Sequence, residues 1–369
     1  MKIAFFHNLP TGGAKRVLYE QVKFFSRKGR VDIYEIRGGK NDLFEFENIG
    51  CKIYRYTFVL NSKLPRILAR LSSDYKNIVL LNTLHKKIAQ DIDNGKYNFV
   101  IVHPDRYTQA PYLLRYLKTD HFYYCHELLR IGHEKELRIS DSLSCINKMY
   151  ESLTRKIRKA IDKKNAMSAM KIIANSNFIK RKVKNEYGKE CVVCYPGIDP
   201  LVFRARAKIK KNKILFVGEP NLINGYNLIE ESLAFIEKNK RPKIDIVNFL
   251  SGNLILSDKQ LSRLYSESLL TVCLSYNEPF GMVALESMAC ETPVIAVNEG
   301  GYKETVINGV TGFMIKRNPT QLAKRINDLT GDRNLVKELG ENGRREVLKR
   351  WTWSHHFQSL EKIVKKEIL

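Results

Sequence analysis

The sequence predicts an α/β protein made of two Rossmann-like domains, each with a doubly wound parallel sheet. Short apolar runs of strand length alternate with longer stretches of helical periodicity through the 369 residues. The alternation falls into two series, which are separated by a basic linker at residues 199–212. Strands that alternate with helices form parallel sheets, and a chain of this length can bury two cores. We therefore expect domains at residues 1–200 and 201–350, followed by a tail at 351–369.

The first series opens with a strand at residues 2–7, a turn that contains Gly12 and Gly13, and a helix at 15–27. The run at 99–103 is apolar almost throughout, which is typical of a parallel strand buried on both faces. The further strands that we expect in this series lie at residues 31–36, 52–56, 122–126, 171–175 and 191–195.

The second series contains the same alternation after the linker. Its predicted strands lie at residues 213–218, 244–247, 271–275, 293–297 and 312–315. The tail begins with the chain's only two tryptophans, Trp351 and Trp353, which we interpret as packing anchors because large aromatic side chains bury much apolar area.

Composition excludes several classes of protein. The amino terminus has no apolar run of signal-peptide length, and no segment reaches the roughly 20 apolar residues of a membrane span, so we expect a cytoplasmic chain. The seven cysteines are scattered, and the pair Cys191 and Cys194 lacks the histidines or second pair of a zinc site. We therefore expect reduced core thiols and no bound metal.

The formal net charge of +24 is concentrated between residues 155 and 189, where twelve Lys and Arg accompany only Asp162 and Glu186. Apolar residues in this stretch keep roughly helical spacing, so one side can pack while a basic side is exposed. A solvated surface and an anionic membrane surface both fit this pattern. Nucleic acid fits less well, because no recognition motif or aromatic platform accompanies the charge.

The segment at residues 275–286 carries the strongest functional signal. It places Glu278 in a Pro-Gly turn and Glu286 inside the apolar run that follows. We expect Gly281 to open a short buried helix, so that the backbone N–H groups from Phe280 through Met282 to Val283 can bind an anion. The pattern predicts a phosphorylated, hydroxyl-rich ligand. Alternatively, Glu278 only stabilises the helix dipole, and Glu286 is a hydrogen-bonded core carboxylate.

This segment, together with residues 292–295, Gly300, Gly301, Glu304 and residues 311–313, resembles the donor-binding half of the retaining family 4 glycosyltransferases. The resemblance implies the GT-B fold, in which two such domains face each other across a cleft, and a tail helix that returns to the first domain. It implies transfer of a sugar from a nucleotide-diphosphate sugar to a glycan or lipid-linked acceptor, without a cofactor or metal. A location at the cytoplasmic face of a membrane fits such an acceptor.

The resemblance also implies roles for single residues. Glu278 would bind the hydroxyls of the donor sugar, Glu286 would bind the ribose, and the amides of residues 280–283 would bind sugar and phosphate. Gly12, Gly13 and Arg16 resemble the Gly-rich loop on the other side of the cleft, and Gly218 ends a strand next to the donor. His103 and His126 both end apolar strands, and we prefer His126 as the histidine at the reacting face.

One departure from the family concerns the diphosphate. An arginine normally follows the glycine at position 218, and a lysine follows five residues later, whereas this chain has Glu219 and Asn224. Negative charge develops on the leaving diphosphate, so cations are expected nearby. Either Lys15, Arg16, Arg130 or Lys303 supplies that charge, or the chain is a catalytically impaired subunit or scaffold that keeps the nucleotide pocket. A nucleotide-sugar epimerase and a glycoside hydrolase are the weaker alternatives.

Overall fold

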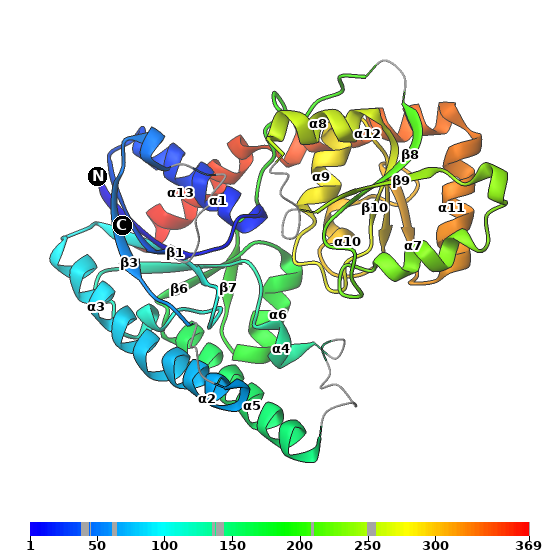
Figure 1. Ribbon diagram of the computed structural model, residues 1–369. Helices are drawn as coiled ribbons and strands as arrows, with labels where there is room; N and C mark the ends of the chain where they lie inside the picture. The colour runs from blue at the N-terminus through cyan, green and yellow to red at the C-terminus, as the bar shows by residue number, and fades with distance from the viewer. Residues whose placement is uncertain are drawn as a thin grey trace. The chain divides into compact units, whose positions relative to one another are not determined.

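The computed structural model describes residues 1–37, 44, 46–60, 65–134, 137, 144–207, 210–248 and 256–368. The chain contacts divide it into two compact units (Figure 1). Unit 1 contains Met1–Asn175, Ile179–Cys194 and Ile363–Leu369. Unit 2 contains Ser176–Phe178 and Tyr195–Lys362.

Unit 1 is built on a seven-stranded parallel sheet with the order β3-β2-β1-β4-β5-β6-β7. The strand order reverses between β1 and β4, and ligands bind at such switch points in open α/β sheets. Every residue of β4 is buried, as its apolar sequence predicts. The strands are β1 (Lys2–Asn8), β2 (Arg30–Arg37), β3 (Lys52–Thr57), β4 (Phe99–Asp105), β5 (His121–Cys125), β6 (Lys171–Ala174) and β7 (Cys191–Val193).

The helices of unit 1 connect these strands in the order that a doubly wound sheet requires. One long helical arm consists of α2 (Arg66–Tyr75), one π-helical turn η2 (Lys76–Leu80) and α3 (Leu81–Asn94). The other helices are α1 (Gly13–Ser26), α4 (Arg130–His133), α5 (Cys145–Ser168) and α6 (Asn177–Tyr187), with short 3-10 turns at η1 (Phe46–Ile49) and η3 (Tyr112–Arg115).

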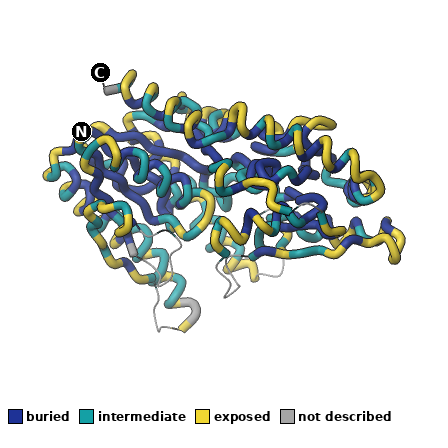
Figure 2. Tube along the Cα trace, turned by 90° about the horizontal axis from the view of Figure 1, so that it is seen from above, coloured by how far each residue is buried: buried dark blue, intermediate teal, exposed yellow. Residues whose placement is uncertain are grey.

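Unit 2 contains a five-stranded parallel sheet with the order β12-β11-β10-β8-β9. Both β10 and β11 are fully buried, and Figure 2 shows the buried stretches of the chain as dark-blue tube in the interior. The strands are β8 (Lys211–Val217), β9 (Lys243–Val247), β10 (Ser268–Cys273), β11 (Val294–Val297) and β12 (Gly312–Ile315). The fold prediction of two parallel-sheet α/β domains is confirmed.

The helices of unit 2 surround this sheet. They are α7 (Tyr226–Leu233), η5 (Lys238–Lys240), α8 (Asp258–Glu267), α9 (Met282–Ala289), α10 (Tyr302–Thr305), α11 (Pro319–Gly331), α12 (Arg333–Arg350) and α13 (Trp353–Ile368). Helix α9 is buried from Ala284 to Ala289 and packs against α12. Gly343 of α12 allows this close approach, because a Cβ added there would lie 3.0 Å from the Cβ of Met288.

The tryptophans are packing anchors, as predicted. Trp351 is buried, and its ring centroid lies 5.1 Å from that of Tyr195 and 5.6 Å from that of Phe280. Phe280 lies between Glu278 and α9, so this aromatic cluster packs against the turn that contains Glu278.

The cysteine prediction needs one correction. All seven cysteines are free, and five of them are buried, but Cys51 is half-buried and Cys145 is exposed at the first turn of α5. Cys145 is therefore a surface thiol, because the amphipathic helix that carries it turns this position away from the sheet.

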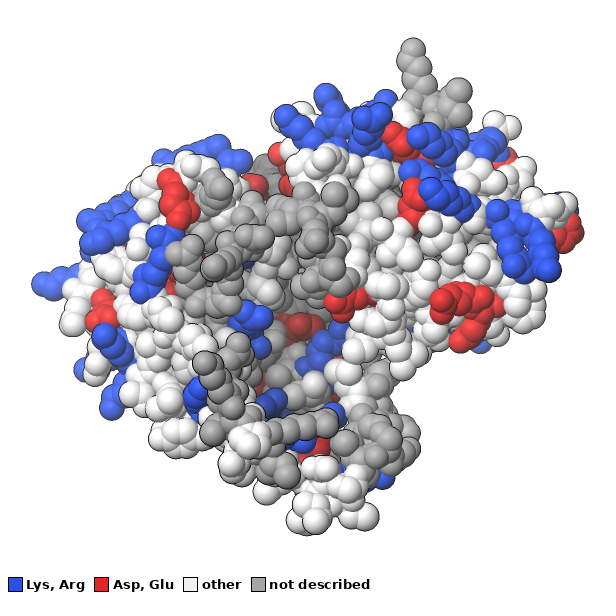
Figure 3. All heavy atoms as spheres, in the orientation of Figure 1, with Lys and Arg blue, Asp and Glu red and all other residues white. Residues whose placement is uncertain are grey.

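Among the described residues, no helix combines the length and hydrophobicity that crossing a bilayer requires. On the face of the molecule in Figure 3, Lys and Arg side chains are spread over both units and interspersed with Asp and Glu. The net charge of +24 is therefore not gathered in one continuous patch on this face.

Candidate functional site

The turn before α9 holds Glu278 against the start of the helix. Gly281 is the N-cap residue with φ 103°, a backbone conformation that a residue with a Cβ rarely adopts. Its N–H donates to Glu278 Oε1 at 3.2 Å. The N–H groups of Met282 and Val283 lie in the first helical turn, where amides have no intrahelical acceptor. The predicted helix start at Gly281 is confirmed. The Glu278 carboxylate and the amides of the first helical turn therefore lie close together in the sequence and in the structure.

Two consecutive glycines fix the position of that turn. Gly300 has φ 56°, and a Cβ added there would lie 2.5 Å from the carbonyl oxygen of Glu278. The N–H of Gly301 donates to the same oxygen at 2.7 Å. Only a residue without a side chain fits against this carbonyl oxygen. The glycine pair of the sequence motif therefore packs against the Glu278 backbone and holds it in place.

Glu286 is buried on the inner face of α9. Its Oε2 accepts a hydrogen bond from the hydroxyl of Tyr265 on α8 at 2.9 Å. Burial, followed by the charge of Glu286, raises the pKa of Tyr265 well above its usual value, so this hydroxyl stays a donor. The Tyr265 hydroxyl thus helps to fix the orientation of the buried carboxylate. Tyr265 is a site residue that the sequence did not reveal, because it lies on another helix.

The loop after β8 is stabilised by the residues that replace the expected cations. Gly218 has φ 149° and ends the strand with its N–H bonded to Val247. The side-chain amide of Asn224 donates to the carbonyl of Glu219 at 3.0 Å, and Asn221 donates to the carboxylate of Glu219 at 3.2 Å. Glu219 and Asn224 therefore shape a closed loop and bring no positive charge to it.

The cations that could replace the missing arginine and lysine differ in burial and in ion pairing. Lys15 is buried, with Nζ 5.9 Å from the ring centroid of Phe46. Arg130 pairs with Glu134 at 2.8 Å, whereas Lys303 is exposed. Arg317, which the sequence did not single out, donates to the carbonyl of Leu274 at 2.8 Å, at the end of β10. It also pairs with Glu299 at 2.7 Å. Arg317 thus brings an arginine to the strand that precedes the Glu278 turn.

Unit 1 contains the predicted histidine at the end of β5. His126 Nε2 lies 3.2 Å from His103 Nδ1, and His103 Nε2 lies 2.9 Å from Gln21 Oε1. The amide oxygen of Gln21 accepts from His103 Nε2–H, so neutral His103 must accept at Nδ1 from His126 Nε2–H. This places the lone pair of neutral His126 on Nδ1. The two histidines that the sequence offered as alternatives are therefore joined by a hydrogen bond, through which His103 orients His126.

The Gly-rich turn of unit 1 opens α1 as the sequence suggests. Gly12 is the N-cap residue with φ 155° and ψ −171°, a region that only glycine adopts readily. Gly12 and Gly13 are exposed, and the N–H of Arg16 bonds to the carbonyl of Gly12 at 3.0 Å. The turn thus presents accessible backbone at the carboxyl end of β1.

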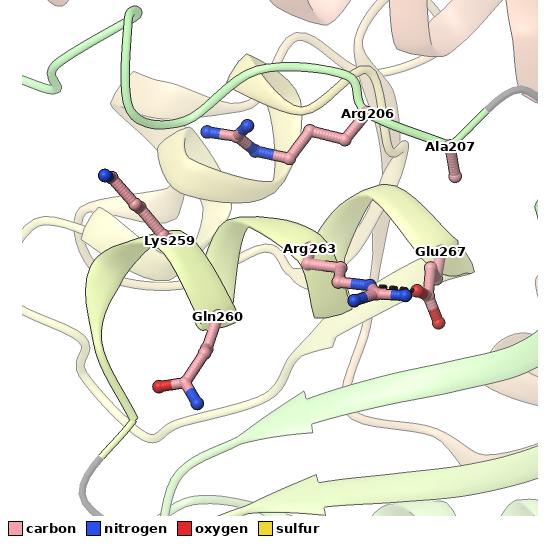
Figure 4. A pocket seen from close by; sticks show the side chains of 6 residues that line it. All are labelled: Arg206, Ala207, Lys259, Gln260, Arg263 and Glu267. Atoms are coloured by element: carbon pink, nitrogen blue, oxygen red, sulfur yellow. Dashed lines mark hydrogen bonds and ion pairs between the residues drawn. The ribbon is translucent and has the colours of Figure 1, made fainter.

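A separate pocket of about 560 Å³ lies beside α8 (Figure 4). Lys259, Gln260, Arg263 and Glu267 line it from the helix, and Arg206 and Ala207 line it from the segment before β8. It shares no residue with the predicted site. Among the described residues, no group of three or more His, Cys, Asp or Glu side chains is arranged to hold a metal ion.

Comparison with known families identifies the chain. A family model described as Glycosyltransferase Family 4 matches residues 11–200, which is just over half of the 369 residues. A second model, Glycosyl transferases group 1, matches residues 247–346 and includes the segment from Glu278 to Glu286.

The chain belongs to glycosyltransferase family 4.

Relatives of this family 4 chain share part of its sequence. An uncharacterized glycosyltransferase of Methanocaldococcus jannaschii is 31% identical over 208 residues, which cover 52% of this chain and 58% of the relative. The spore coat protein SA of Bacillus subtilis is 31% identical over 160 residues, which cover 42% of this chain and 40% of the relative. The matched segment thus spans about half the length of these curated relatives.

Solved structures share the fold over the whole chain. HepE of Anabaena in complex with UDP and glucose has a TM-score of 0.72 at 17% identity, and the alignment covers 99% of both chains. Sucrose-phosphate synthase of Thermosynechococcus elongatus has a TM-score of 0.75 at 18% identity, with 99% of this chain and 98% of that chain covered. The fold of this family 4 chain is the GT-B fold that the sequence predicts.

Proposed function

We propose that this chain is a retaining glycosyltransferase that moves a sugar from a nucleotide-diphosphate sugar to a glycan or lipid-linked acceptor. The observation that carries the proposal is the short helix α9 with the turn before it, which together contain Glu278, the amides after Gly281 and buried Glu286. A diphosphate needs N–H donors, and a ribose or hexose needs acceptors for its hydroxyls. This one element offers both kinds of group.

In this reaction the bond between the anomeric carbon and the phosphate oxygen breaks, and a bond from the same carbon to the acceptor oxygen forms on the same face. The acceptor proton passes to the departing phosphate oxygen, so the products are the glycoside and the nucleoside diphosphate. Glu278 binds hydroxyls of the sugar, Glu286 binds the ribose, and the amides of residues 280–283 bind phosphate. We assign His126 to the reacting face and Gly12, Gly13 and Arg16 to donor binding, as the family resemblance implies. No metal is required.

The relatives support the choice of substrates to test. HepE of Anabaena has been crystallised with UDP-glucose, which supports a uridine-diphosphate sugar as the first donor to examine. The capsular polysaccharide biosynthesis glycosyltransferase CapM of Staphylococcus aureus is 28% identical over 170 residues, and its name supports a glycan product. A lipid-linked glycan would place the reaction at the cytoplasmic face of a membrane.

A second candidate is a catalytically impaired subunit that keeps the nucleotide pocket. Glu219 and Asn224 favour it, because they occupy the positions of two cations and hold their own loop closed. The intact group at Glu278, Gly281 and Glu286 favours the enzyme, since a chain that has lost its activity tends to lose several site residues together.

Calorimetric titration of the protein with a panel of nucleotides and nucleotide sugars tests the proposal. One uridine, guanosine or adenosine diphosphate sugar should bind, and Glu286→Ala should weaken that binding about 10- to 150-fold, which corresponds to about 1.5–3 kcal/mol for hydrogen bonds to a charged group. Tyr265→Phe removes the neighbouring hydroxyl but keeps the carboxylate, and it should change affinity much less. Equal affinity in the wild type and a folded Glu286→Ala variant would refute the nucleotide assignment.

A further inference from the structure

Helix α5 carries an exposed apolar stripe that the fold leaves uncovered in unit 1. Ile146, Met149, Leu153 and Ile157 are between 37% and 76% exposed. Their spacing of three and four residues places them on one side of the helix. The opposite side contains Asp162, Asn165 and Ala166, which are buried against the sheet domain.

The arm formed by α2 and η2 has a matching stripe. Leu68, Leu71, Tyr75 and Val79 follow the same spacing and are between 42% and 57% exposed. Monomeric proteins scatter single apolar side chains over their surfaces, but a continuous apolar row on each of two neighbouring helices marks an interaction surface.

The two helices are held side by side in the same direction (Figure 1). Near their amino-terminal ends, Arg70 pairs with Glu151, and its guanidinium lies 4.6 Å from the ring centroid of Tyr150. Further along both helices, Asp74 pairs with Arg158 at 2.7 Å. The residues that join the two helices belong to neither apolar stripe, so both stripes remain on the solvent-exposed side of the pair. We call this side the α2–α5 face.

Among the residues that the structure describes, the unpaired charge beside the stripe of α5 has one sign. Two carboxylates of α5 could neutralise the lysines of this face, but both have other partners. Glu151 pairs with Arg155 at 2.8 Å, and buried Asp162 accepts from the hydroxyl of Tyr187. Exposed Lys156, Lys163 and Lys164 remain beside the apolar stripe of α5.

Several cations of the 155–189 stretch do not contribute to this charge. Lys171, Lys182 and Lys184 form ion pairs elsewhere, with Glu367, Glu134 and Glu190. Lys156, Lys163 and Lys164 are the exposed cations of this stretch on α5, whereas Arg181 is exposed on α6.

We propose that the α2–α5 face docks on an anionic lipid bilayer, with the apolar rows entering the boundary between headgroups and acyl chains. Amphipathic helices bind such surfaces through buried apolar area together with attraction of Lys and Arg to anionic lipids. A second copy of the chain would bring the same lysines against each other in a two-fold contact. A nucleic acid would leave the apolar rows without a partner. The role of docking in catalysis rests on the proposed lipid-linked acceptor, whereas the docking itself does not.

Flotation with lipid vesicles tests the proposal. The wild type should float with vesicles that contain phosphatidylglycerol and should bind pure phosphatidylcholine vesicles at least tenfold more weakly. The triple variants Leu71→Ser, Met149→Ser, Leu153→Ser and Lys156→Glu, Lys163→Glu, Lys164→Glu should each lose at least tenfold in binding. The variant Lys324→Glu, Lys337→Glu, Lys349→Glu makes the same charge change at exposed sites of unit 2 and should float like the wild type. Circular dichroism confirms that each variant is folded.

A native thiol gives a direct readout of contact. Cys145 is exposed at the first turn of α5, beside Ile146. An environment-sensitive fluorophore on Cys145, in a Cys51→Ser background, should shift to the blue when anionic vesicles are added and should not shift with the serine variant. Absence of flotation and of a shift at low salt would overturn the proposal. A dimer in sedimentation velocity that the serine substitutions dissociate would assign the face to a second copy instead.

The outcome is separable from that of the proposed function. Nucleotide affinity measured without lipid should be the same in the wild type and in both α2–α5 variants. Loss of flotation with intact nucleotide binding supports docking, whereas failure of the wild type to bind any nucleotide sugar refutes the transferase proposal and leaves the flotation result unchanged.

Discussion

His103 Nδ1 lies 3.2 Å from His126 Nε2, and this hydrogen bond joins two strand-end histidines whose chain positions are far apart. The ring of His103 is stacked between Phe5 at 6.4 Å and Tyr124 at 5.4 Å. Packing therefore holds His103 in place, and its second nitrogen is held by Gln21 at 2.9 Å. A fixed His103 gives His126 one orientation and one tautomer.

The first prediction concerns the hydrogen bond between His103 and His126. His103→Phe keeps the stacked ring but removes the acceptor for His126, so we expect turnover to fall about tenfold, the value of one buried hydrogen bond of about 1.4 kcal/mol. Nucleotide affinity should stay unchanged. His103→Gln, whose amide oxygen can accept, should recover part of the loss, and His126→Ala should lose more than either. Wild-type turnover in His103→Phe would contradict the orienting role.

The second prediction concerns Glu278. Glu278→Gln keeps an oxygen that can accept from the N–H of Gly281 but loses the charge, so turnover should fall about 10- to 100-fold while nucleotide affinity changes little. Glu278→Ala should also lose about 1 kcal/mol of stability, because the N–H of Gly281 loses its side-chain acceptor. Steady-state kinetics with calorimetry separates the two effects. A larger loss in nucleotide affinity than in turnover would place Glu278 at the nucleotide instead of the sugar.

The third prediction concerns the missing cation. Glu219→Arg restores positive charge beside Gly218 and removes only the hydrogen bond from Asn221, so the transfer rate should rise about tenfold or more. Glu230→Arg makes the same charge change on an exposed position of α7 and should leave the rate unchanged. A wild type that binds nucleotide without turnover, together with an active Glu219→Arg variant, would favour the impaired-subunit alternative. An unchanged rate in both variants would show that another cation serves the diphosphate.

The fourth prediction concerns metal. Activity should survive dialysis against a chelator, because the proposed reaction balances its charge with protein groups. Release of nucleoside diphosphate can be followed before and after treatment. Abolition by the chelator and recovery with magnesium or manganese would show that an ion binds the diphosphate in place of the missing cations.

The fifth prediction concerns pH and His356. Burial lowers the pKa of His356 from 6.5 to about 4, although its Nδ1–H donates to the carbonyl of Tyr195 at 2.6 Å. The unfolded chain therefore binds more protons than the folded chain between these pH values. The free energy of unfolding should fall by as much as about 3 kcal/mol as pH drops from 6.5 to 4.

His356→Asn keeps a side-chain N–H for Tyr195 but does not titrate, so it should flatten this dependence. His355→Asn alters the exposed neighbour and should keep the wild-type slope. Urea unfolding at several pH values measures both variants. Equal slopes in the wild type and His356→Asn would assign the acid sensitivity to other groups, among them His7, whose pKa is also lowered by burial and by Lys15.

Local pattern by itself determined the order of the elements and the place of the turn that contains Glu278. Apolar runs of strand length predicted the strands of both sheets, because burial on both faces leaves little choice of residue. Gly281 predicted the start of α9, since its φ of 103° is accessible mainly to glycine. Gly300 and Gly301 could be recognised as part of a motif, but their contact with the carbonyl of Glu278 could not, because that contact is made across a loop.

Tertiary structure alone decided which side chains meet. The pairs Tyr265 with Glu286 and His103 with Gln21 join different elements, and sequence spacing holds no information on such contacts. The basic stretch at 155–189 is a further example. Its composition gives the number of charges, but only the fold shows that several of them pair with carboxylates far away in the sequence. Only folding brought the apolar row of α2 beside that of α5. The sequence of one helix predicts which of its faces is apolar, but it does not predict which other helix will lie next to that face.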